Sequence, residues 1–219
     1  MKKKSIVALL VYIASFLLVN IVIIGLVHYL KLDEVSYLQW NVFLQVVSSF
    51  LLFIFYAYYF RTSLKKEWQI FVQKKTYKRL FLWLIVFYGC SILANVLTMA
   101  IGAGVSQNQQ VAETLLTTVP LIMVIDVIIF GPFVEEIIFR FVIFKLAGFR
   151  LRSVFISVLV FGLAHVIMGG DYLNVIPYLF MGGIFAWSYY RTKTIWLPII
   201  LHMITNALGV ISIFMLKGI

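Results

Sequence analysis

The stretch SIVALLVYIASFLLVNIVIIGLVHY, residues 5–29, contains no aspartate, glutamate, lysine or arginine. Roughly 20 consecutive apolar residues span the hydrocarbon core of a bilayer as a helix, so this stretch predicts a membrane-spanning helix. Lys2, Lys3 and Lys4 precede it, as basic residues precede the apolar part of a signal peptide. The run is too long for a signal peptide and lacks a small-residue cleavage site, so we expect the helix to remain attached.

Similar apolar runs continue along the chain. Its 219 residues are 63% hydrophobic and 12% charged, with a mean hydropathy of +1.06. A soluble domain of this length cannot bury so much apolar surface. We therefore predict an all-α fold, a polytopic membrane helical bundle that forms one transmembrane domain over residues 1–219. About seven transmembrane helices are expected, at 5–29, 39–60, 79–102, 117–146, 153–168, 173–190 and 195–216.

The basic residues predict how the bundle is oriented. If seven helices cross the membrane, 16 of the 18 lysines and arginines lie on the same side as the N-terminus. Because basic residues concentrate in cytoplasmic loops, we expect a multi-pass cell-membrane protein with a cytoplasmic N-terminus. The same placement accounts for the net charge of +10 without nucleic acid, which we do not expect as a partner.

Residues 62–79 form the one substantial cytoplasmic loop of this arrangement. Leu64, Trp68, Phe71 and Lys75 follow helical spacing, with further lysines around them. This pattern favours a basic amphipathic helix lying on an anionic membrane surface. A solvated linker is the alternative, because the apolar face is short.

Ionisable groups within membrane spans are costly and mark functional sites. Apart from Asp126, which we leave outside the site, they form three patterns that include one asparagine. The patterns are Glu135-Glu136-x-x-x-Arg140, Phe161-x-x-x-His165 and His202-x-x-x-Asn206.

Helix geometry predicts that these groups meet. Glu136 and Arg140 share a helix face and can pair, while Glu135 is rotated by about 100° and stays free. Counted from the nearest basic residue at each cytoplasmic helix end, Glu135, His165 and His202 lie about 15, 20 and 14 Å deep. Three separate helices thus place polar groups in one band below the cytoplasmic surface.

Such a cluster suits amide hydrolysis. The reaction needs an activated water molecule, a base that takes its proton, and donors for the developing oxyanion. A glutamate in a low-dielectric pocket can serve as the base. A second glutamate, neutralised by Arg140, can hold the first in place. Histidine and asparagine can donate to the oxyanion or bind a metal.

The three motifs, in this order, resemble those of the CAAX protease and bacteriocin-processing (CPBP, or Abi) family of intramembrane peptidases. The resemblance covers residues 118–210 and implies a catalytic core there, with catalytic roles for six residues. Glu135 and His165 would activate water, His202 and Asn206 would stabilise the oxyanion, and Glu136 and Arg140 complete the set. Phe141 departs from the small residue or tyrosine that often follows the arginine in that family, which affects substrate fit more than chemistry.

The resemblance also implies partners and leaves alternatives open. The substrate would be a membrane-associated peptide or protein, cut at a site facing the cytoplasm, in bacteriocin maturation or self-immunity. No HExxH zinc helix is present, and no cofactor is required by the sequence, but Glu135, His165 and His202 could bind zinc or another divalent metal. The alternative function is a non-catalytic membrane partner or immunity protein that regulates a sensor or receptor through helix–helix binding.

Overall fold

The computed structural model describes residues 1–219 except 105, 107–109, 111–113, 115–119, 168–169 and 218–219. These described residues form helices and no strand, which confirms the all-α fold class. The longer helices are α1 (Lys2–Leu30), α2 (Glu34–Tyr59), α3 (Arg61–Gln73), α4 (Leu80–Ala100), α9 (Leu151–Ile167), α10 (Val175–Thr192) and α11 (Trp196–Lys217). Between α4 and α9 lie the shorter elements α6 (Pro120–Ile125), η2 (Asp126–Phe130), α7 (Gly131–Glu136), η3 (Ile137–Val142) and α8 (Ile143–Ala147), and the short 3₁₀ helices are η1 (Thr76–Arg79) and η4 (Tyr172–Asn174).

Each predicted span contains helix, and the chain is a multi-pass membrane protein. Within the described residues, four helices are long and apolar enough to cross a membrane, at Lys2–Leu30, Val35–Tyr59, Thr76–Ala100 and Trp196–Leu216. The total of seven crossings and the side of the N-terminus stay predictions. Residues 117–119 and 168 of the predicted spans lie outside the described residues.

The fourth predicted span is a run of helical segments of changing pitch. The π-helical segment η2 lies directly before Gly131 and Pro132, and a second π-helical segment, η3, follows Glu136. Pro132 lies in the first turn of α7, where its missing N–H is least costly. Because a π-helical segment changes the rotation of the residues that follow it, η2 affects the direction of the side chains on α7, and η3 affects that of the side chains on α8.

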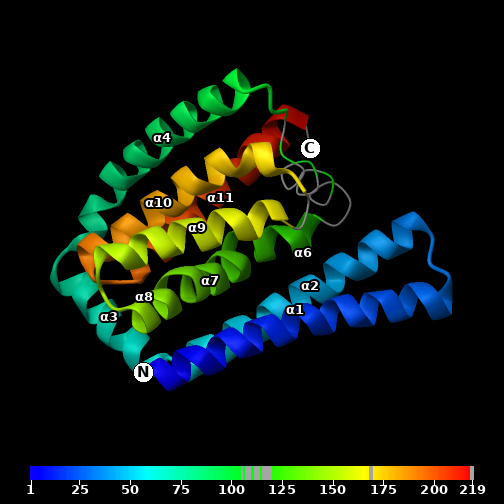
Figure 1. Ribbon diagram of the computed structural model, residues 1–219, viewed down its shortest axis with the longest axis horizontal. Coiled ribbons are helices and arrows are strands. Elements are labelled where there is room, and N and C mark those ends of the chain that lie inside the picture. Colours follow the sequence, from blue (N-terminus) through cyan, green and yellow to red (C-terminus); the bar gives the residue numbers. More distant parts are fainter. Residues whose placement is uncertain (105, 107–109, 111–113, 115–119, 168–169, 218–219) are drawn as a thin grey trace.

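Helix α7 packs against α2 and α11, and η3, which follows α7, contacts α1, α9 and α10. Helix α4 packs on the outer face of α10 (Figure 1). The hairpin of α1 and α2 contacts the η2–α8 segment and diverges from the bundle towards its turn. In that turn, Lys31 ends α1 in a left-handed conformation (φ 51°), and Asp33 accepts a 2.9 Å hydrogen bond from the backbone N–H of Ser36. Hydrogen bonds from the side chain and from the backbone of Ser36 lower the pKa of Asp33.

Helix α3 forms within the predicted amphipathic loop and packs against the bundle. Leu64, Glu67 and Phe71 are buried. Glu67 accepts hydrogen bonds from the hydroxyl of Tyr189 (3.1 Å) and the backbone N–H of Ile195 (2.9 Å). Leu64 and Phe71 of the predicted apolar face are therefore covered by protein, whereas Trp68 is 43% exposed, and contact with an anionic membrane surface stays a prediction.

Candidate functional site

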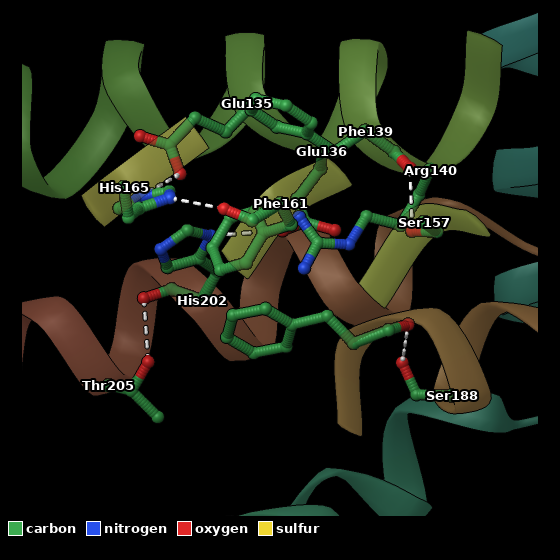
Figure 2. Close-up of polar contacts among 11 residues, drawn as sticks. Glu135, Glu136, Phe139, Arg140, Ser157, Phe161, His165, Ser188, His202 and Thr205 are labelled. Carbon is green, nitrogen blue, oxygen red and sulfur yellow. Dashed lines mark hydrogen bonds and ion pairs between the residues drawn. The ribbon is translucent and has the colours of Figure 1, made fainter. Parts of the chain in front are cut away.

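The carboxylate of Glu135 and the ring of His165 face each other from α7 and α9 (Figure 2). Oε2 of Glu135 lies 3.8 Å from Nε2 of His165, and the two side chains keep 29% and 16% of their surface exposed. Nδ1 of His165 lies 2.8 Å from the carbonyl oxygen of Phe161. Because a carbonyl only accepts, Nδ1 carries the hydrogen, and Nε2 of the neutral ring is an acceptor. One water molecule beside the pair can therefore donate a hydrogen bond to each of these two acceptors.

Glu136, Arg140 and His202 form a second group that is buried away from solvent. Oε1 of Glu136 lies 3.1 Å from Nη1 of Arg140 and 3.0 Å from Nδ1 of His202. Glu136 and Arg140 are 0% exposed and His202 is 4% exposed. Glu136 thus pairs with Arg140, as expected from their spacing, and also with His202 on α11.

Aromatic rings connect the two groups. Phe161 is fully buried, with its ring centroid 4.2 Å from that of His165 and 4.0 Å from the guanidinium carbon of Arg140. The ring of Phe185 stacks on that of His202, with centroids 4.6 Å apart, and lies 5.3 Å from the same guanidinium carbon. Phe161, which the motif predicted, and Phe185, which it did not, therefore hold both histidines and the arginine in fixed positions.

Asn206 lies one turn beyond His202 on α11 and contacts the π-helical segment η2. Its Nδ2 donates a 2.8 Å hydrogen bond to the carbonyl oxygen of Val127. A carboxamide nitrogen has two hydrogens, so one remains for another acceptor. The structure thus brings Glu135 to His165 and Glu136 to Arg140 and His202, and it ties Asn206 to η2.

The expected metal ligands do not gather into one set. Nδ1 of His202 is directed at Glu136, whereas Glu135 faces His165. Within the described residues, no group of three His, Cys, Asp or Glu side chains has an arrangement that could hold a metal ion. The reaction proposed below therefore uses no metal ion.

A crevice with a volume of about 360 Å³ opens beside Glu135. Its walls come from α1, α2 and α7, and polar side chains of the first two helices line it. They are Tyr12, Asn20, Asn41, Gln45, Ser48 and Ser49. The predictions from the sequence did not include this set. The spacing of residues 41, 45, 48 and 49 places them on one helix face and could have indicated it.

Comparison with known proteins shows which part of the chain is similar to a known family. Residues 117–208 match the family model for type II CAAX prenyl endopeptidases, described as Rce1-like. The match covers under half of the chain and makes this range similar to a CAAX endopeptidase domain. All six predicted site residues fall inside the matched range, and the resemblance to the CPBP family is confirmed.

Two curated relatives show the extent of this similarity. The chain is 38% identical over 109 residues to the Bacillus subtilis (strain 168) protein named "Putative membrane peptidase YdiL", covering 48% of this chain and 43% of that protein. It is 36% identical over 135 residues to the Staphylococcus aureus (strain USA300) "Membrane-embedded CAAX protease MroQ", covering 57% and 52% respectively. The alignments thus span about half the length of these relatives. No solved structure matches the chain.

Proposed function

We propose that this protein is a membrane-embedded peptidase that hydrolyses peptide bonds with a water molecule activated by Glu135 and His165. The observation that carries the proposal is the pair itself: two acceptors 3.8 Å apart, partly exposed, beside a fully buried charged group. A water molecule between them can donate one hydrogen to each. Glu135 then serves as the general base.

The reaction follows from these positions. As the water oxygen bonds to the carbonyl carbon, its proton moves to Glu135 and the carbonyl oxygen becomes an oxyanion. When the C–N bond breaks, Glu135 returns the proton to the leaving nitrogen. The free N–H of Asn206 can donate to the oxyanion, as can Nε2 of His202 when that ring is doubly protonated.

The substrate in this proposal is a membrane-associated peptide or protein. The two relatives named as a membrane peptidase and a CAAX protease support this class. Bacteriocin maturation or self-immunity, suggested by the family resemblance, is the proposed setting. In that setting, a strain that carries only Glu135→Gln protein is expected to lose the maturation or immunity phenotype.

The test compares cells that carry the wild-type protein or the Glu135→Gln variant. Terminal peptides of membrane proteins are quantified by mass spectrometry, and candidate substrates are then cleaved with purified protein in vesicles. Loss of the base is expected to slow cleavage by about 10²–10⁴-fold. An Asp33→Asn variant, altered in the α1–α2 turn, is expected to keep full activity because asparagine also caps helices well. Full activity of the Glu135→Gln protein contradicts the proposal.

We also propose that the site opens to the cytoplasm of the cell. The proposal rests on the distribution of basic residues. In a Cys90→Ser background, a membrane-impermeant maleimide added to intact cells should label Tyr29→Cys, at the end of α1 next to the α1–α2 turn, but not Lys74→Cys after α3. The reverse labelling pattern contradicts this orientation.

A further inference from the structure

The crevice between α1, α2 and α7 lies outside the region that the family model matches, except at its α7 wall. Glu135 stands at this wall together with Gly131 and Val134. On α1 the lining residues run from Tyr12 to Asn20, and on α2 from Asn41 to Leu52. The crevice therefore leads from the reactive carboxylate along the face that the hairpin turns towards the bundle.

This crevice contains more polar groups than the contact between α1 and α2 uses. The α1–α2 contact employs Ser15 and Ser48, whose hydroxyl oxygens are 2.5 Å apart. Gln45 donates to the side chain of Asn41 (3.0 Å), and Asn20 donates to the carbonyl oxygen of Phe16 (2.8 Å). Among the described residues, the nitrogen of Asn41 and the carbonyl oxygens of Gln45 and Asn20 have no hydrogen-bond partner.

These free groups stand in helices that are long and apolar enough to cross a membrane. In a bilayer, polar groups without partners are costly, and a free carboxamide is tolerated where it lines a cavity that something polar enters. One nitrogen donor and two carbonyl acceptors match the N–H and C=O groups that alternate along a peptide backbone. A lipid chain offers no such groups.

The length of the crevice suits a short extended peptide. From Tyr12 to Asn20 the helix rises by about 12 Å, at about 1.5 Å per residue. An extended chain advances by about 3.3–3.6 Å per residue, so the crevice accommodates about three or four residues beside Glu135. A peptide bond at Glu135 must be extended to be attacked, and its neighbours lose their helical hydrogen bonds in the same step.

We infer that the Asn20, Asn41 and Gln45 face of the α1–α2 hairpin binds the extended backbone of a membrane-inserted polypeptide next to the scissile bond. This inference rests on the proposed function and narrows its substrate class to segments that enter the bilayer. The hairpin amides replace the helical hydrogen bonds that the substrate gives up. The amides hold the backbone, while Glu135 and His165 act on the bond.

A cross-linking experiment tests the inference apart from catalysis. Glu135→Gln protein is reconstituted in phosphatidylcholine vesicles with a pool of apolar peptides of about 20 residues, long enough to span a bilayer, that carry photo-leucine at varied positions. After illumination, mass spectrometry locates the adducts. Adducts on residues 12–20 and 41–52 support the inference. Adducts confined to other helices, or adducts at these residues with a photoactivatable phosphatidylcholine alone, overturn it.

Matched variants sharpen the test. Asn41→Leu with Gln45→Leu removes the hydrogen bonds while keeping the spans apolar, and is expected to reduce adducts by about tenfold. Gln39→Leu, exposed on the same helix and outside the crevice, is the control and is expected to change nothing. Equal adduct yields in both variants overturn the inference.

Cleavage of the same peptide pool by wild-type protein separates the two claims. If adducts form in the crevice but no peptide is cleaved, the inference holds and the proposed peptidase function is contradicted. If cleavage depends on Glu135 but the adducts form elsewhere, the peptidase function holds and the inference is overturned.

Discussion

Oε1 of Glu136 lies 3.0 Å from Nδ1 of His202, although 66 positions separate the two residues in the chain. The same oxygen lies 3.1 Å from Nη1 of Arg140. We expected Glu136 to be neutralised by Arg140, and it is. That Glu136 holds Glu135 in place stays a prediction, whereas its contact with His202 gives Glu136 another role, which is to orient the imidazole on α11.

Removing the charge of Glu136 is expected to destabilise the fold. The Glu136→Gln variant leaves the guanidinium of Arg140, fully buried, without a counter-charge. Breaking a buried ion pair in this way costs about 3–5 kcal/mol. Thermal unfolding in detergent should show a lower midpoint for Glu136→Gln, while Glu135→Gln stays close to the wild type because Glu135 is partly exposed. Equal midpoints for Glu136→Gln and the wild type would contradict this assignment.

Two adjacent glycines on α10 offer a matched pair of substitutions. A Cβ atom at Gly182 would lie 3.0 Å from Cδ1 of Phe161, whereas one at Gly183 would lie 4.0 Å from Cγ2 of Val158. Gly182→Ala must displace the ring of Phe161, which contacts His165. We expect a stability loss of about 1–3 kcal/mol together with a lower kcat, because overpacking forces neighbours out of place.

The Gly183→Ala variant serves as the control for this prediction. The added Cβ makes an ordinary van der Waals contact without strain, and alanine has a higher helix propensity than glycine. The unfolding midpoint and kcat of Gly183→Ala should therefore match or exceed those of the wild type. Equal kcat values for the two alanine variants would show that Phe161 does not position His165.

The contact between Glu136 and Arg140 could be predicted because its signal is local. The four-residue spacing of Glu136 and Arg140 dictates one shared face, and the rise per residue predicts that Glu135 and His165 lie at similar depth. The choice of Glu136, not Glu135, as partner of His202 depends on the rotation of α7, which the preceding π-helical segment η2 changes. Periodicity assumes a constant 3.6 residues per turn and cannot give this rotation.

Other features had weaker signals in the sequence. Phe185 stacks on His202, but it is one of 20 phenylalanines in the chain. Its residue type therefore does not mark it as part of the site. Glu67 follows two lysines, Lys65 and Lys66, yet its helical spacing places it on one face with Leu64 and Phe71.

Metal chelation gives a direct check on the proposed chemistry. Since Glu135 and His202 face different partners, the proposed water activation needs only Glu135 and His165. Cleavage by purified protein should therefore persist in EDTA or 1,10-phenanthroline, with the rate unchanged within error. Loss of activity in chelator, restored by added zinc, would show that the ligands rearrange around a metal.

The last prediction concerns the carboxylate that docks α3. Glu67 accepts from the hydroxyl of Tyr189 and from the backbone N–H of Ile195, one residue before α11 begins, so it caps the helix that carries His202. Glu67→Ala leaves both donors buried without an acceptor, at about 1–3 kcal/mol each. Glu67→Gln keeps one carbonyl acceptor and should fall between Glu67→Ala and the wild type in unfolding midpoint. Lys66→Ala, exposed beside it, should match the wild type, and an equal midpoint for Glu67→Ala would show that α11 does not depend on this cap.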